Sequence, residues 1–292
     1  MSPTAGYRKC DPDERRGSMK GRIIPRNWKT FLKVAAVWQP VTDFWTKTTA
    51  WPVVGRLTGW IVNREHYDVT LVPVNRELEA GSTVVPRQAV EEIVRRSCHR
   101  VILPLCLCRI GCRCQDYPME IGCIFMGEGA RQIDPSIGKP VSVEEALAHV
   151  ERAVSAGLVI QIGRVDPDPF MLGIPMRDWG RFLTLCFCCP CCCIAMRNIN
   201  NWDPDIRRRI HRLEGLRIEV TDECNGCGKC VKACFTGAVR LEDGRAVIGG
   251  ECKGCGICAS ACPRNAIRIE VADGDRMMEE FFRRVESYAD VT

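Results

Sequence analysis

The sequence predicts an α+β protein, in which a cysteine-rich mixed α/β domain is followed by a small duplicated domain. Its 292 residues leave room for about two domains, and 46% of them are apolar, enough for a hydrophobic core. Amphipathic helical patterns lie between cysteine-rich segments, and the last quarter of the chain repeats itself. We expect a tryptophan-rich helical segment at residues 1–68 and the cysteine-rich domain at 69–200. A basic linker helix at 201–217 then leads to the duplicated domain, which occupies residues 218–292 and ends in a closing helix.

The 21 cysteines are the unusual part of the composition. A chain of this length is not a small disulfide-linked scaffold, and its polar first 20 residues lack the apolar core of a secretory signal. No apolar run reaches the roughly 20 residues that span a bilayer. We therefore expect a cytoplasmic protein, where clustered reduced cysteines usually bind metal.

The amino-terminal segment is basic and rich in tryptophan. Residues 1–67 carry 12 lysines and arginines against 5 acidic residues. Its tryptophans are Trp28, Trp38, Trp45, Trp51 and Trp60. Residues 28–62 suit peripheral contact with the inner face of a membrane, and equally a packing surface for this protein or a partner subunit. No helix-turn-helix, zinc-finger or single-strand-binding pattern accompanies the charge, so we expect no nucleic-acid partner.

Four segments have helical patterns. Residues 85–103 predict a helix that runs into a short strand, with Ala89, Ile93 and Val94 on its apolar face. Residues 142–159 begin with a capping box and end at a glycine. A basic amphipathic helix is expected at 206–217, and a closing helix at 279–289. The glycines of 127–138 lack the ending of a phosphate loop, and no nucleotide or flavin motif is present.

Residues 218–271 repeat at an offset of 28 residues, and each copy contains C-x2-C-x2-C-x3-C. This is the bacterial spacing for [4Fe–4S] clusters, in which the fourth cysteine of one copy ligates the cluster of the other copy. Glycines between the cysteines let each loop curl and expose backbone N–H groups. We therefore expect one cluster on Cys224, Cys227, Cys230 and Cys262, and another on Cys252, Cys255, Cys258 and Cys234.

This pattern resembles the bacterial two-cluster ferredoxins, over the whole of the repeat. The sequence departs from the ferredoxin pattern at Phe235, where proline is usual, while Pro263 keeps it. The change alters a local turn and removes no ligand. Zinc bound by paired C-x2-C motifs is the alternative, but zinc does not explain eight cysteines in this duplicated order.

Eleven further cysteines lie in two groups between residues 106 and 193: Cys106, Cys108, Cys112, Cys114 and Cys123, then Cys186, Cys188, Cys189, Cys191, Cys192 and Cys193. In extended chain, residues two apart share a face and adjacent residues point apart. The second group therefore cannot close around one small cube by itself. Either the two groups share two clusters, which their number favours, or some of these cysteines are buried core residues. One cluster, a zinc site and a noncubane cluster remain as alternatives.

The cysteine-rich segments contain three motifs: C-x-C-R, then C-x-D-x-P-x-E-x2-C, and later C-C-x-C-C. In these motifs the chain resembles a group of iron–sulfur proteins with a ferredoxin tail. The resemblance implies metal ligands at Cys106, Cys108, Cys114, Cys123, Cys188, Cys189, Cys191 and Cys192. Cys186 and Cys193 are weaker candidates. Arg109 is expected either to offset the charge of the thiolates or to pair with Asp116 or Glu120.

These features predict an electron-transfer protein rather than a stand-alone enzyme. It would carry electrons through two ferredoxin-type clusters, and one or two more, to a partner redox enzyme. A reductase with its own substrate or flavin site in the middle domain is one alternative, and a redox sensor or cluster scaffold is another. No acid–base pair is evident, and flavin is not indicated. Crowded thiols are prone to oxidation, so anaerobic conditions are expected.

Overall fold

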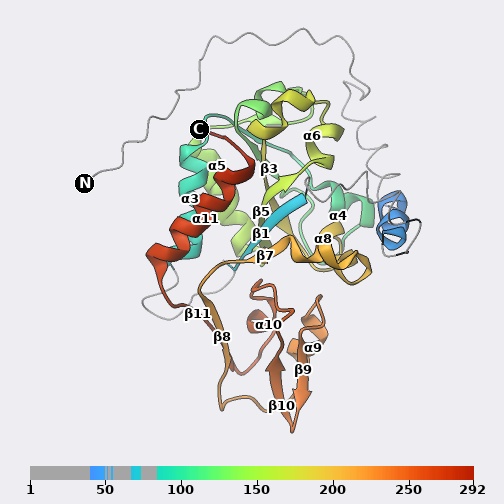
Figure 1. Ribbon diagram of the computed structural model, residues 1–292, viewed down its shortest axis with the longest axis vertical. Coiled ribbons are helices and arrows are strands. Elements are labelled where there is room, and N and C mark those ends of the chain that lie inside the picture. Colours follow the sequence, from blue (N-terminus) through green and yellow to red (C-terminus); the bar gives the residue numbers. More distant parts are fainter. Residues whose placement is uncertain (1–39, 50, 52–53, 55–66, 74–83) are drawn as a thin grey trace.

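A seven-stranded sheet forms the centre of the larger domain (Figure 1). The computed structural model describes residues 40–49, 51, 54, 67–73 and 84–292. The strand order is β4-β2-β3-β6-β5-β1-β7, and neighbours are antiparallel except β1 and β7. The strands are β1 (Tyr67–Val72), β2 (Arg100–Ile102), β3 (Ile124–Met126), β4 (Lys139–Pro140), β5 (Val159–Val165), β6 (Leu183–Cys188) and β7 (Ile210–Arg212).

Three long helices cover one face of this sheet, and short helices lie on the other side (Figure 1). The long ones are α3 (Val84–Arg96), α5 (Val143–Ser155) and α11 (Gly274–Tyr288). The short elements are α4 (Leu107–Cys112), α6 (Pro167–Met171), α7 (Ile194–Asn198) and α8 (Pro204–Arg208), with 3-10 turns η1 (Glu128–Gln132), η2 (Met176–Arg181) and η3 (Ile199–Asn201).

Strand β6, with the sequence LTLCFC, faces two different cores. Leu185 and Phe187 pack into the hydrophobic cluster beneath the long helices. Cys186 and Cys188 lie in the cluster on the opposite side, together with Tyr67 of β1. The prediction that cysteines two apart share a face is therefore confirmed for this pair.

The two best-patterned helices are confirmed. The predicted helix at 85–103 is α3, followed by the short strand β2. Helix α5 has its capping box, because Ser142 Oγ accepts from Glu145 N and the Glu145 carboxylate accepts from Ser142 N. Gly157 then adopts a φ of +72°, which ends the helix.

The linker helix expected at 206–217 is wrong. Helix α8 ends at Arg208, the next residues form β7 beside β1, and a new strand begins at Leu216. Ile206 and Ile210 are both buried in the same hydrophobic cluster. The spacing of Ile206 and Ile210 is compatible with one continuous helix, and equally with a helical turn followed by a strand. The edge of β1 supplies backbone hydrogen-bond partners, and these favour the strand.

The duplicated segment forms a small body at one end of the molecule, which we call the repeat module (residues 216–271; Figure 1). Its strands pair as two antiparallel ribbons, β8 with β11 and β9 with β10. The predicted closing helix is α11, and it packs against α3 and β5 of the larger domain. The module's elements are β8 (Leu216–Val220), α9 (Lys229–Ala233), β9 (Val239–Glu242), β10 (Arg245–Ile248), α10 (Ile257–Ser260) and β11 (Ile267–Val271).

Most of the tryptophan-rich segment lies outside the described residues, including Trp28, Trp38 and Trp60. Residues 40–48 are helical, with Trp45 half-buried. Within the described ranges, no helix has the length and apolar character needed to cross a bilayer.

Packing of α11 on the larger domain predicts a large effect of Phe281→Ala. Phe281 is 3% exposed within the main hydrophobic cluster. Removing its ring leaves a cavity, and we expect a loss of about 3–5 kcal/mol in the free energy of unfolding, measured by urea denaturation. Phe170→Ala is the matched control, because Phe170 is 53% exposed and its loss should cost less than about 0.5 kcal/mol. Equal losses in the two variants would contradict this packing.

Candidate metal centres

Glycines shape both cysteine loops of the module. Gly226, Gly228, Gly254 and Gly256 all have φ between +67° and +81°, a region that L side chains rarely adopt. A Cβ on Gly226 would also lie 2.2 Å from Gly244 O. The loop between the first two cysteines therefore passes too close to the β9–β10 turn to carry a side chain.

The first predicted ligand set meets around one cavity. Cys224, Cys227 and Cys230 line it together with Cys262, which comes from the other copy of the repeat. The other walls of this cavity include Leu241 and Ile267. Apolar walls and converging sulfurs fit an iron–sulfur cube, because burial and sulfur donors are what such clusters take.

The second predicted set also lies together. The pKa of Cys255 is raised to about 12, mainly by burial and also by nearby Cys258, Cys252 and Cys234. Burial likewise raises the pKa of Cys258 to about 12, with Cys252 and Cys234 again adding to the shift. Each thiol would be costly as a bare thiolate, so bound metal cations would stabilise the deprotonated set.

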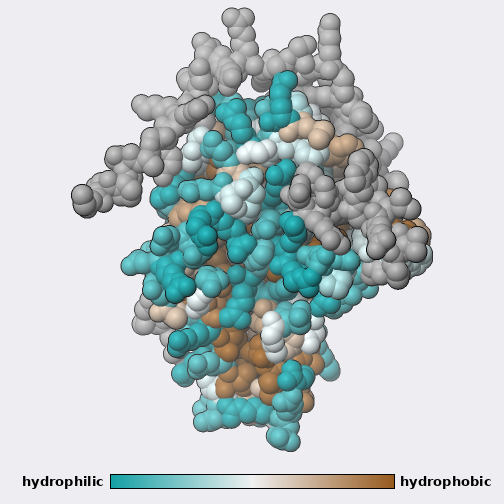
Figure 2. Space-filling model, viewed as in Figure 1, coloured by the Kyte–Doolittle hydropathy of each residue, from teal (hydrophilic) through white to brown (hydrophobic). Residues whose placement is uncertain are grey.

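Backbone N–H groups point at several of these sulfurs. In donor–acceptor order the pairs are Ala246 N–Cys224 Sγ at 3.5 Å, Gly254 N–Cys252 Sγ at 3.4 Å and Ala266 N–Cys262 Sγ at 3.3 Å. The bonds from Ala246 and Gly226 lower the pKa of Cys224. Such N–H···S contacts stabilise thiolate and raise the potential of a bound cluster. Figure 2 shows that hydrophobic residues, among which its scale counts cysteine, gather on this part of the module.

In the larger domain, four of the predicted ligands form a compact group, which we call the quartet. The Sγ atoms of Cys114, Cys189, Cys191 and Cys192 all lie within 4.8 Å of one another. Cys114 follows α4, and the other three belong to the loop after β6. Four sulfurs at this spacing suit a four-thiolate metal site, either a tetrahedral zinc or an iron–sulfur cluster.

The other four predicted ligands lie apart from the quartet, together with the two weaker candidates. We call this set the six-thiol group: Cys106, Cys108, Cys123, Cys186, Cys188 and Cys193. Two of its Sγ–Sγ distances are 3.3 Å, from Cys123 to Cys186, and 3.2 Å, from Cys193 to Cys188. Cys106 and Cys108 hydrogen-bond to each other, and Cys108 interacts electrostatically with Cys193. The i, i+2 spacing of Cys186 and Cys188 is the sequence signal that places these two thiols on one face.

Arg109 is fully buried between the two groups. It donates to the backbone carbonyls of Phe187, at 2.8 Å, and of Ile121. Burial lowers the pKa of Arg109, but the thiols of Cys106 and Cys189 outweigh it and the net shift is upward. Among the described ion pairs, none joins Arg109 to Asp116 or Glu120. Of the two expected roles, the geometry therefore favours compensation of thiolate charge.

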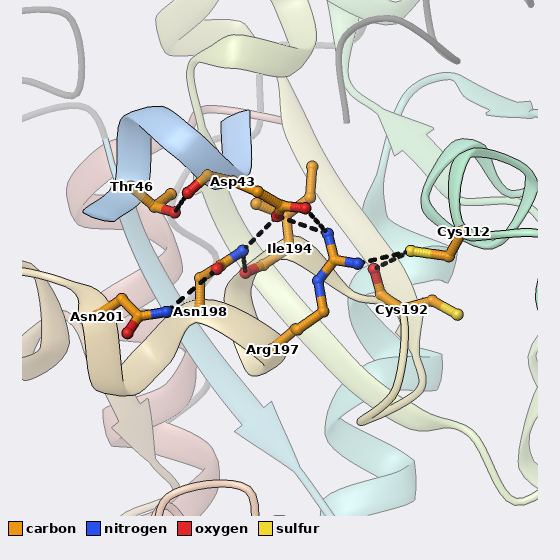
Figure 3. Close-up of polar contacts among 8 residues, drawn as sticks. All are labelled: Asp43, Thr46, Cys112, Cys192, Ile194, Arg197, Asn198 and Asn201. Carbon is orange, nitrogen blue, oxygen red and sulfur yellow. Dashed lines mark hydrogen bonds and ion pairs between the residues drawn. The ribbon is translucent and has the colours of Figure 1, made fainter. Parts of the chain in front are cut away.

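A second arginine lies beside the quartet (Figure 3). Arg197 Nη1 donates to Cys112 Sγ at 2.9 Å, and Nη2 pairs with both carboxylate oxygens of Asp43 at 2.5 Å. Asn198 Nδ2 donates to the same carboxylate at 2.8 Å. Sequence reasoning did not single out Arg197, because its partners lie 85 and 154 residues away along the chain. The contact fastens the helix at residues 40–48 to α7, next to the cysteine loop.

Comparison with protein families identifies the repeat. Residues 223–267 match the 4Fe-4S dicluster domain family, a span that contains all eight cysteines of the module. Neither the curated proteins nor the solved structures compared gave a match. The iron–sulfur character of the module therefore rests on family and geometry together, whereas for the larger domain only the arrangement of its cysteines indicates a metal site.

The close approach at Gly226 predicts selective loss of cluster binding in Gly226→Ala. Its Cβ would collide with Gly244 O, so the loop must shift and its cysteines with it. We expect substoichiometric iron and weaker visible absorption after anaerobic purification. Gly237→Ala is the matched control, because Gly237 has a φ of +71° but nothing within 4 Å of the added Cβ. It should cost only about 1–2 kcal/mol of stability and keep full iron content. Full iron content in Gly226→Ala would contradict the argument.

Proposed function

We propose that this protein transfers electrons between partner redox proteins, through two [4Fe–4S] clusters in the repeat module and a further iron–sulfur cluster at the quartet. The observation that carries the proposal is the convergence of Cys224, Cys227 and Cys230 with Cys262 from the other repeat copy. The quartet extends it into the larger domain. When bound, these clusters supply one-electron transfer, while the protein sets their position and potential.

Exposed cysteines support exchange at two separate surfaces. Cys227 is exposed on the module. In the quartet only Cys191 is exposed, and its three companions are buried. An exposed ligand marks where a partner can approach the metal most closely, so the two cysteines indicate one contact surface on each domain. The electron donor and the electron acceptor are then two different proteins, or one protein that binds the two surfaces at different times.

Specific contacts hold the module against the larger domain. Phe235, the residue that departs from the ferredoxin pattern, packs against the hydrophobic cluster of α7 and α8. Its carbonyl accepts from Asn200 Nδ2 at 2.9 Å. Lys253 Nζ donates to Arg207 O at 3.1 Å, and Arg207 pairs with Glu251 at 3.3 Å. Phe235, at the proline position of the ferredoxin pattern, thus helps to dock the module on the larger domain. This docking favours fixed distances between the metal sites.

Removal of one quartet ligand tests the proposal. We expect anaerobically purified Cys191→Ser to contain about four fewer irons per chain than the unmodified protein, because its cluster loses a thiolate. The EPR signals of the module should be unchanged. Cys112→Ser is the control, since Cys112 lies beside the quartet but outside it. Unchanged iron in Cys191→Ser, or zinc in place of iron, would overturn the quartet as an electron-transfer site.

The charge of Arg197 predicts a potential shift. A cation near the ligands stabilises the reduced, more negative state of a cluster, so Arg197→Gln should make the quartet potential more negative. Arg177→Gln is the control, because the Arg177 side chain is 74% exposed and its partner is Asp178. EPR-monitored redox titration measures both. Identical potentials in the two variants would contradict a role for Arg197 in tuning.

A further inference from the structure

The six-thiol group is the largest set of sulfur atoms that the quartet and the module leave unused in the described part of the chain. We propose that Cys106, Cys108, Cys123, Cys186, Cys188 and Cys193 form a second iron–sulfur site of the larger domain, with the Tyr67 hydroxyl as a hydrogen-bond donor to it. This inference deepens the proposed function and rests on it, because the site would serve the same electron transfer.

The six-thiol group is physically separate from the quartet. Cys188 and Cys189 are consecutive, yet Cys188 belongs to the hydrophobic cluster beside α7 and α8, and Cys189 to the cluster beneath the long helices. The buried guanidinium of Arg109 lies near one thiol of each group, Cys106 and Cys189. A single small cluster cannot draw ligands from both groups, so two sets of sulfurs mean two sites.

The geometry of the group fits a ligand better than ordinary core packing. The contacts of 3.2 Å and 3.3 Å are well beyond the roughly 2.05 Å of a disulfide, so these are thiols in contact. Cys186 lies on a central strand, between β3 and β5, where neighbouring Leu185 and Phe187 are at most 1% exposed. Its own side chain is only half-buried, as is that of Cys123. These two thiols are therefore not sealed within the core as their neighbours on β6 are.

Tyr67 supplies the second, independent observation. Its hydroxyl is buried and has no hydrogen-bond partner among the described residues. Tyr67 packs in the same hydrophobic cluster as Cys188 and Cys193, and Cys186 packs against that cluster, so the tyrosine lies close to these thiols. A buried hydroxyl without an acceptor is destabilising, and the sulfur of a bound cluster would provide that acceptor.

The site also lies next to the module. Cys255 of the second ferredoxin-type ligand set packs, with Ile257 and Phe235, against the hydrophobic cluster that contains Cys188 and Cys193. The module therefore presents one of its two cluster loops to the six-thiol group. Such proximity suits a redox site and has no use in a structural zinc site.

Paired ligand variants test the site in the full-length protein purified without oxygen. We expect Cys186→Ser combined with Cys193→Ser to lower the iron and sulfide content by about four or more irons per chain. Its Mössbauer and EPR spectra should keep the components that Cys191→Ser removes, and lose others. Native mass spectrometry then assigns the lost mass to inorganic iron and sulfide. Far-UV circular dichroism and the module's EPR signals check that the double variant folds.

The outcomes separate the two proposals. If the double variant keeps the iron content and spectra of the unmodified protein, or if the lost metal is zinc, the six-thiol site is overturned while the quartet stands. If Cys191→Ser loses no iron but the double variant does, the quartet fails and the six-thiol site stands. Loss of identical spectral components in both variants would mean one shared centre and would overturn the separation argued above.

Tyr67→Phe tests the hydroxyl without removing a ligand. We expect full iron content and a more negative potential for the six-thiol site, because a donor to cluster sulfur raises the potential. Tyr288→Phe is the matched control: the Tyr288 hydroxyl is also buried without a hydrogen-bond partner, but its electrostatic neighbours are Asp68 and Arg284. Equal potentials in Tyr67→Phe and the unmodified protein would overturn the role of Tyr67.

Discussion

Successive side chains of β6 point to opposite sides of the central sheet, and the arrangement of sulfur in the larger domain depends on this alternation. Leu185 and Phe187 complete the core beneath the long helices, while Cys186 and Cys188 lie on the other side. The chain then turns, and Cys189 crosses to the helix side. A strand of six residues thus completes a hydrophobic core and also separates two groups of thiols.

Electrostatics supports the same separation. A buried guanidinium is costly unless anionic groups and hydrogen-bond acceptors surround it. Arg109 has backbone carbonyl acceptors on β6 and near β3, and thiols on both sides. Arg197 is only partly buried and has a full carboxylate partner in Asp43. The two arginines therefore differ in their partners: the charged groups near Arg109 are thiols, whereas Arg197 has the Asp43 carboxylate in addition to the thiol of Cys112.

Sequence reasoning was strongest where local chemistry decides the structure. The capping box of α5 and the duplicated cysteine spacing of the module depend on residues a few positions apart, and both are present. It failed at residues 206–217, where pairing with β1 outweighed a helical pattern. It left the contact between Cys186 and Cys123 unforeseen, because the two cysteines lie 63 residues apart along the chain. In the larger domain, sequence spacing predicted the two cysteine segments that supply the thiols. Only the folded chain shows which cysteines of one segment lie beside which cysteines of the other.

The position of the module in the chain has a further consequence. Leu216 at the start of β8 lies opposite Val271 at the end of β11, and α11 then returns to pack on α3. The module is therefore an insertion whose two ends are neighbours, rather than an appendage on a single tether. An insertion with adjacent ends resists swinging, and it also makes a natural unit of exchange: a different electron-carrying domain could be grafted between the same two positions without disturbing the sheet that holds the remaining cysteines.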